Sequence, residues 1–130
     1  MRDLHTIPRV QLAFTPTPLQ DVPRLAKTLG LRRLLIKRDD QTGLALGGNK
    51  ARKLEFLFAD AIAQGADTVV TMGGPQSNHC RMTAAAARVC GLRAQLVFNS
   101  YDLRPVDDVQ GNMLLDRMLG APWRFTKPGQ

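Results

Sequence analysis

The fold class follows from residues 68–79, which read Thr68-Val69-Val70-Thr71-Met72-Gly73-Gly74-Pro75-Gln76-Ser77-Asn78-His79. The first five residues are β-branched or apolar, which predicts a short buried strand. Gly73-Gly74-Pro75 ends that strand, and Ser77 is a suitable N-cap for a following helix. The apolar side of this helix should carry Met82, Ala85, Ala86 and Val89. A strand that leads through a glycine turn into a helix is typical of an α/β protein.

The same alternation continues on both sides of this stretch. We expect further helices at Val22–Leu29, around the apolar stripe Leu54, Leu57, Phe58, Ala61 and Ile62, and at Val109–Leu119. We expect further strands at Leu34–Arg38, Ala94–Phe98 and Trp123–Phe125, and a loop around Arg104–Asp108. The proline-rich residues 1–30 should otherwise be extended. This order predicts a three-layer α/β protein with a parallel sheet and crossover helices.

Composition and charge narrow the class of protein. The 130 residues suit one domain, and 44% of them are hydrophobic. The net charge is +7, but the basic residues are scattered and aromatic residues make up 5%, so we expect no nucleic-acid partner. We expect a cytoplasmic protein without membrane contact, because no signal peptide or membrane-length apolar run is visible. Cys80 and Cys90 should be reduced thiols, and no metal-ligand spacing occurs.

Lys50 ends a glycine-rich loop, Gly43-Leu44-Ala45-Leu46-Gly47-Gly48-Asn49-Lys50. The loop is close to a Walker A sequence, but Asn49 interrupts it and Ala51 replaces the magnesium-binding hydroxyl, so a nucleoside-triphosphate site is not expected. Lys50 stands one turn before Leu54 and should point toward the apolar side of the helix. A neutral amine there can form a Schiff base with an aldehyde. Position alone favours an ordinary lysine whose stem covers the edge of the core.

The second candidate loop, residues 73–79, follows a strand and opens a helix, which is where open α/β sheets bind ligands. The free amides of the first helical turn, with Ser77 and Asn78, can hold a carboxylate or phosphate; a capped helix without a ligand fits equally well. His79 can act as an acid or base, although a single histidine is more often structural. Arg52-Lys53 can neutralise a phosphate or stand as solvated charges, the second being the safer interpretation of Arg52.

These segments together resemble one enzyme family. Ile36-Lys37-Arg38-Asp39-Asp40, Gly47-Gly48-Asn49-Lys50-Ala51-Arg52-Lys53-Leu54-Glu55 and Gln76-Ser77-Asn78-His79 occur in the order and spacing of the pyridoxal-phosphate-dependent D-cysteine desulfhydrase and 1-aminocyclopropane-1-carboxylate deaminase family. Gly111-Asn112 and Leu114-Leu115-Asp116-Arg117 are also similar to it. The resemblance runs from about residue 15 to residue 125.

The resemblance implies a tryptophan synthase β-like fold of type II and pyridoxal 5'-phosphate as the cofactor. It implies that Lys50 forms the Schiff base and that Asn78 contacts the pyridoxal 3-oxygen. Lys53 would lie near the cofactor phosphate. Ser77, Asn78 and His79 would bind the substrate carboxylate, so that Lys50 and Ser77 are the expected catalytic residues.

His79 after Ser77-Asn78 favours the desulfhydrase, because the deaminases tend to carry glutamine there. The expected reaction therefore converts D-cysteine to pyruvate, sulfide and ammonia. Deamination of 1-aminocyclopropane-1-carboxylate, or a sulfo-lyase reaction on cysteate, is the alternative.

Members of this family are much longer than 130 residues, and the full-length proteins are expected to be homodimers. Residues 1–49 would belong to the large domain, residues 50–130 would form the small α/β domain, and the rest of the large domain would be absent. We therefore expect the chain alone to be inactive or nearly so. A non-catalytic remnant that self-associates, or binds a partner through exposed apolar surface and open sheet edges, is the alternative of another class.

Overall fold

A three-stranded parallel sheet lies in the C-terminal part of the protein. The computed structural model describes residues 3–100 and 109–127. The sheet contains β3 (Thr68–Gly73), β4 (Arg93–Asn99) and β5 (Trp123–Thr126), in that spatial order. The connection from β3 to β4 contains α3 (Asn78–Val89), and that from β4 to β5 contains α4 (Gly111–Met118). The predicted parallel sheet with crossover helices is confirmed, while the loop predicted at residues 104–108 lies outside the described residues.

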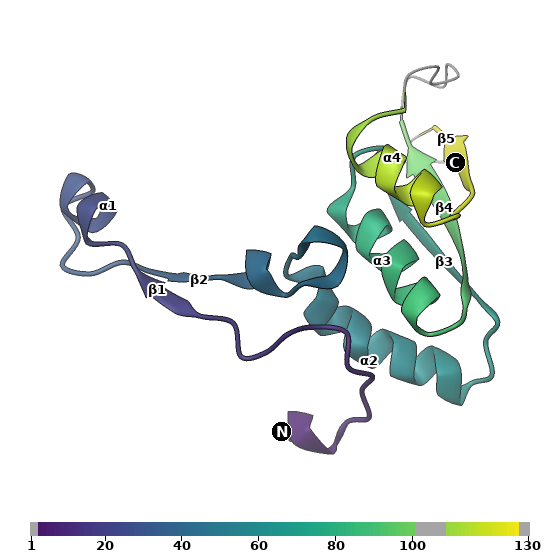
Figure 1. The fold of residues 1–130 in the computed structure, drawn as a ribbon, viewed down its shortest axis with the longest axis horizontal. Coiled ribbons are helices and arrows are strands. Elements are labelled where there is room, and N and C mark those ends of the chain that lie inside the picture. The colour runs from purple at the N-terminus through teal and green to yellow at the C-terminus, as the bar shows by residue number, and fades with distance from the viewer. Residues whose placement is uncertain (1–2, 101–108, 128–130) are drawn as a thin grey trace.

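Helices α3 and α4 cover one face of this sheet (Figure 1). The side chains of Leu96 and Phe98 on β4 are fully buried on that face. The centroid of the Phe98 ring lies 5.9 Å from that of Trp123 and 5.7 Å from that of Phe125. Residues 81–87 of α3 are all buried, because this helix lies between the sheet, α4 and α2. Its four consecutive alanines leave room for close packing.

The opposite face of the sheet is open. Val70 and Met72 on β3 point to it and are 69% and 51% exposed. Because side chains alternate along a strand, the buried residues of β4 face the helices and the intervening ones face this open side. The described residues thus supply two of the three layers that the sequence predicted.

Helix α2 (Lys50–Ala63) packs beside α3. Its buried face contains Ala51, Leu54, Glu55 and Phe58, which follow helical spacing. The expected stripe was wrong at two positions, since Leu57 and Ile62 are 53% and 43% exposed. The face is rotated because the carboxylate of Glu55 takes a buried place, where its Oε1 accepts from the backbone N–H groups of Leu12 and Ala13, each at 3.0 Å.

An extended arm precedes α2 and projects from the body (Figure 1). Its stem is an antiparallel pair of short strands, β1 (Leu19–Asp21) and β2 (Leu35–Lys37), and α1 (Pro23–Thr28) lies at its far end. The strand expected at Leu34–Arg38 was therefore wrongly placed in the parallel sheet, because its partner is β1, which the sequence did not predict. Short 3-10 helices η1 (Leu4–Thr6), η2 (Asp39–Gln41) and η3 (Leu44–Leu46) complete the chain.

In the part of the chain that the structure describes, no helix has the length and apolar character that a membrane span requires.

Candidate pyridoxal-phosphate site

Lys50 is the first residue of α2, and the loop before it is held in one backbone conformation. Gly47 has φ of +76°, and a Cβ there would overlap the carbonyl oxygen of Asp40. The fully buried hydroxyl of Thr42 donates to the carbonyl of Gly48 at 2.8 Å and accepts from its N–H at 2.9 Å. These contacts fix where α2 begins. The half-buried Lys50 then donates from Nζ to Oδ1 of Asn49 at 3.0 Å.

The second predicted loop forms the start of α3. Ser77 is its N-cap, as expected, with Oγ accepting from the backbone N–H of Cys80 at 3.3 Å. Gly73 makes this turn possible, because a Cβ there would lie 2.6 Å from Oγ of Ser77. Asn78 is exposed on the first turn, and its Oδ1 accepts from Nδ2 of Asn112 at 2.9 Å. The side-chain nitrogen of Asn78 has no acceptor among the described residues, so it can donate to a ligand.

His79 is half-buried between α3 and β3. Its Nε2 lies 2.9 Å from Oγ1 of Thr71, and Oγ1 of Thr83 donates to the backbone carbonyl of His79 at 2.8 Å. Burial lowers the pKa of His79 below its usual value, and the positive charges of Lys53 and Lys50 lower it further. The structure therefore brings both lysines of α2 within electrostatic range of the second loop. A neutral imidazole is favoured there.

Arg52 has a structural role that the sequence interpretation missed. Its Nε and Nη2 both donate to the carboxylate of Asp39, each at 2.7 Å, and Nη2 also donates to Oγ1 of Thr17 at 2.9 Å. These bonds hold the pKa of Asp39 down to about 2. Arg52 thus joins α2 to the base of the arm, and the prediction of a simply solvated charge was wrong. Lys53, the next residue, is exposed.

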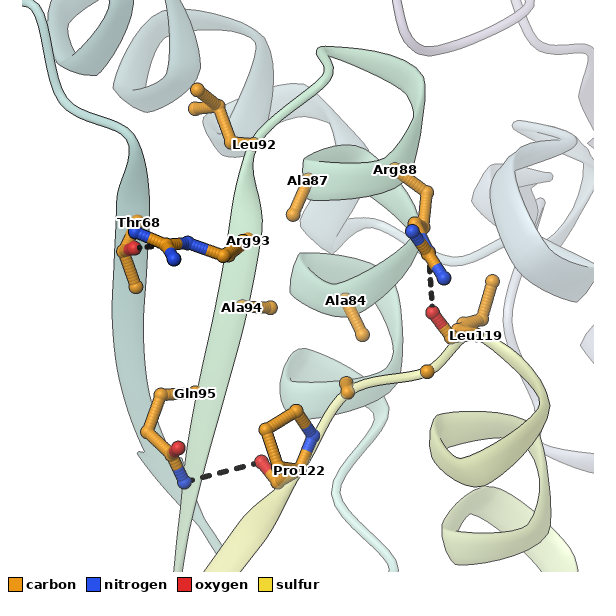
Figure 2. A pocket seen from close by; sticks show the side chains of 12 residues that line it. Thr68, Ala84, Ala87, Arg88, Leu92, Arg93, Ala94, Gln95, Leu119 and Pro122 are labelled. Atoms are coloured by element: carbon orange, nitrogen blue, oxygen red, sulfur yellow. Dashed lines mark hydrogen bonds between the residues drawn. The ribbon is translucent and has the colours of Figure 1, made fainter.

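A cavity of about 330 Å³ lies at the other end of the sheet, where β3 and β4 begin (Figure 2). The side chains of Arg88 and Gln95 at its wall are engaged with the carbonyl groups of Leu119 and Pro122 at 2.6 and 3.2 Å. None of the site residues predicted from the sequence lines it. The two loops that contain the predicted site residues, the loop before Lys50 and residues 73–79, lie instead where β3 ends and where α2 and α3 begin.

Comparison with known proteins identifies the family. Residues 10–129 match the family model described as pyridoxal-phosphate dependent enzyme. The chain belongs to this family. The resemblance noted in the sequence is confirmed, and with it the dependence of the family on pyridoxal phosphate.

The relatives of this member of the pyridoxal-phosphate-dependent enzyme family carry a more specific name. Proteins from Burkholderia ambifaria (strain MC40-6) and Burkholderia vietnamiensis (strain G4 / LMG 22486), each named 1-aminocyclopropane-1-carboxylate deaminase, are 48% identical over 132 residues. Each alignment covers 98% of this chain and 39% of the relative. The chain therefore spans less than half the length of these curated relatives.

A solved structure confirms the fold. It is described as the crystal structure of an ACC deaminase homologue, is 43% identical in sequence and superposes with a TM-score of 0.84. The match covers 95% of this chain and 36% of that one. This member of the family therefore has the expected tryptophan synthase β-like fold over the part it spans.

The residues at the two helix starts fit a pyridoxal phosphate. Lys50 supplies an amine at the edge of the core, Lys53 adds a second positive charge, and Asn78 offers a side-chain N–H that has no acceptor among the described residues. A phosphorylated aldehyde needs these chemical groups: an amine to bind its aldehyde, and cations or amides to bind its oxygen atoms.

Proposed function

We propose that Lys50 holds pyridoxal phosphate through its side-chain amine and that the Asn78 amide donates to the 3-oxygen of its ring. We further propose that Lys53 lies near the phosphate, and that Ser77, Asn78 and His79 bind the carboxylate of a small amino-acid substrate. The observation that carries this proposal is the packing of α2, which begins at Lys50, beside α3, which begins directly after Ser77 and has Asn78 and His79 in its first turn. Family membership supports it.

The chain's own residues then account for binding and proton transfer. When bound, the cofactor supplies an aldehyde for attachment and a ring that takes up negative charge from the substrate. With a substrate that carries an α-hydrogen, such as D-cysteine, the Lys50 amine would remove that proton as a general base. The first-turn amides of α3 and the Ser77 hydroxyl hold the carboxylate and thereby set the orientation of the α-carbon above Lys50.

For the substrate, we propose D-cysteine, which with one water gives pyruvate, hydrogen sulfide and ammonia. His79 supports this choice by its place directly after Ser77-Asn78. The second candidate is 1-aminocyclopropane-1-carboxylate, and the names of the Burkholderia relatives favour it.

We also propose a division into domains, in which residues 50–130 are the small domain and residues 1–49 are a part of the large one. The protein would be cytoplasmic, and its full-length form would be a homodimer.

The test of the site is covalent capture of the cofactor. The full chain is mixed with pyridoxal phosphate, reduced with borohydride and digested, and the modified lysine is found by mass spectrometry. We expect modification at Lys50, with a visible absorption band before reduction that Lys50→Ala abolishes. Lys27→Ala is the control, because Lys27 is an exposed lysine of α1 on the arm. Equal modification in Lys50→Ala would remove Lys50 from its role.

The substrate is tested separately. Sulfide and ammonia are measured after incubation with D-cysteine, with 1-aminocyclopropane-1-carboxylate and with cysteate. We expect the 130 residues alone to release little of any product, because they match only 39% of the relatives' length. Sulfide release at an enzymatic rate would contradict that expectation. In a form with the relatives' length, ammonia from the cyclopropane substrate without sulfide from D-cysteine would favour the second candidate.

A further inference from the structure

Arg81 connects two segments that are far apart in the sequence. It lies on α3, is 8% exposed, and donates from Nη2 to the carbonyl of Gly47 at 2.9 Å. It also donates from Nη1 to Oδ1 of Asn112 at 2.9 Å. Gly47 belongs to the loop that leads into Lys50, and Asn112 belongs to the first turn of α4. One guanidinium therefore holds the lysine loop and the start of α4 together.

Asn112 is in turn bound to the second loop of the site. Its Nδ2 donates to the carbonyl of Gln76 at 2.8 Å and to Oδ1 of Asn78 at 2.9 Å, and its backbone N–H donates to Oε1 of Gln76 at 2.8 Å. Gly111 permits this approach, because its φ is +59° and a Cβ would lie 2.5 Å from Oε1 of Gln76. The start of α4 is thus fitted closely to the start of α3.

The directions of the hydrogen bonds from Arg81 through Asn112 to Asn78 follow from Arg81 and from the carbonyl of Gln76. A guanidinium can only donate, so the atom of Asn112 that faces it must be the oxygen. The nitrogen of Asn112 must then face Asn78, and the atom of Asn78 that meets it must be the oxygen as well. The donor end of the Asn78 amide is consequently directed away from α4. Arg81 and the carbonyl of Gln76, which can only accept, impose this polarity through Asn112, and Arg81 does so without touching Asn78.

We propose that Arg81 and Asn112 are positioning residues that orient the Asn78 amide to donate to the cofactor and anchor the loop before Lys50, an inference that rests on the function proposed above. Burial of Arg81 supports such a role. Its Nε has no partner among the described residues, and a partly satisfied buried arginine costs stability that an apolar side chain would not. The planar guanidinium gives Arg81 two donors in fixed directions for two separate acceptors, which lysine cannot reproduce.

Arg88 provides a matched control. It lies two turns further along α3 and donates from Nε to the carbonyl of Leu119 at 2.6 Å, just after α4 (Figure 2). It therefore also bridges α3 to the α4 region, but at the end remote from Lys50 and Asn78. Arg88→Ala removes a bridge between these elements and leaves the path from Arg81 to Asn78 intact.

The experiment measures the dissociation constant of pyridoxal phosphate by absorption titration of the full chain, with thermal unfolding in parallel. The variants are Asn112→Ala, Asn78→Ala, the double variant, Arg81→Lys and Arg88→Ala. We expect Asn112→Ala to raise the dissociation constant about tenfold, as for loss of one hydrogen bond to a charged oxygen. In the Asn78→Ala background, Asn112→Ala should change it less than twofold, because Asn112 acts through Asn78. Arg81→Lys should weaken binding, and Arg88→Ala should not.

The inference would be overturned if Asn112→Ala raised the dissociation constant by the same factor in the Asn78→Ala background as in the unmodified chain. It would also be overturned if the loss of affinity across the variants simply followed their loss of thermal stability. Asn112→Asp serves as the second variant if Asn112→Ala does not fold. It keeps the size and the acceptor for Arg81 but removes the donor to Asn78, so it should also weaken binding, and unchanged affinity would again overturn the inference. If the unmodified chain fails to attach the cofactor at Lys50, the proposed function itself fails, which separates the two outcomes.

Discussion

The buried carboxyl group of Asp116 should make the stability of the folded protein depend on pH. It is fully buried on α4, and neither carboxylate oxygen has a hydrogen-bond partner among the described residues. Burial raises the pKa of Asp116 to about 6, and the positive charge of Arg81 offsets part of that rise. The folded protein therefore holds this proton more tightly than the unfolded chain does. Stability from Asp116 is complete below about pH 4 and is lost as the pH rises to about 6.

Replacing Asp116 by asparagine should remove this dependence. We expect Asp116→Asn to flatten the fall in the free energy of unfolding between about pH 4 and 6. Above pH 6 it should stabilise the protein by on the order of 1–3 kcal/mol, since no charge is buried. Urea unfolding over a pH series measures both effects. Asp60→Asn, at an exposed position of α2, should keep the slope, and an unchanged slope in Asp116→Asn would refute the assignment.

At the scale of elements, Glu55 decides how the N-terminal residues join α2. Its buried carboxylate accepts from the N–H groups of Leu12 and Ala13, and its Oε2 lies 3.6 Å from Nη1 of Arg9. The backbone N–H of Val10 donates to the carbonyl of Glu55 at 3.0 Å. One residue of the helix thus anchors residues 9–13, which have no strand or helix of their own.

Removal of this carboxylate should detach the segment. We expect Glu55→Ala to lower the free energy of unfolding by about 1–3 kcal/mol, because two buried N–H groups lose their acceptor. Trypsin should also cut faster after Arg9, which limited proteolysis followed by mass spectrometry would detect. Asp60→Ala on the exposed side of α2 should change neither quantity. Equal protection of Arg9 in both variants would contradict this account.

The sequence predicted the elements whose stability comes from local pattern. Ser77 marked the start of α3 and Gly91 its end, and the strand at Ala94–Phe98 was found within one residue at each end. The pairing of β1 with β2 could not be predicted, because strands of three residues carry little periodic signal and prolines surround Leu19–Asp21. The rotated face of α2 was missed because a buried glutamate reads as polar in a sequence.

The candidate site was predicted only in part, because a sequence shows local patterns but not contacts between distant residues. Lys50, Ser77, Asn78 and His79 stand in recognisable local sequences at helix starts. Arg81 and Asn112 were missed as a connection, since their bonds join residues more than thirty positions apart. Gly111-Asn112 had been noted only as a family likeness. The sequence signal for such a search is an arginine that directly precedes Met82-Thr83 and four alanines in a predicted helix, because that helix should be surrounded by other elements.

At the scale of the whole molecule, two groups of exposed apolar side chains on the described residues bear on association between chains. One is on the open face of the sheet, where Val70 and Met72 lie, and the other is on the arm, where Leu19, Leu25, Leu29 and Leu35 are exposed. In addition, β3 and β5 are each paired on one side only within the described sheet. Exposed apolar side chains beside unpaired strand edges favour association between chains.

We therefore expect the chain to self-associate through the open sheet face. The double variant Val70→Thr, Met72→Thr keeps strand propensity at Val70 and removes apolar surface. It should raise the dissociation constant for self-association about tenfold, measured by analytical ultracentrifugation over a concentration series. Leu29→Gln is the comparison on the arm. Loss of association in Leu29→Gln but not in the double variant would place the contact on the arm instead.

The hydrogen bonds from Arg81 to Gly47 and Asn112 also bear on how the protein is made. A ribosome releases Lys50 and its glycine loop early, then α3, and only later the start of α4. Until Asn112 has emerged, the nascent chain can hold its lysine loop by the contacts of Thr42 and Arg81, but the side-chain amide of Asn78 lacks the partner that orients it. A binding site that needs all three segments can therefore form only after translation has passed α4.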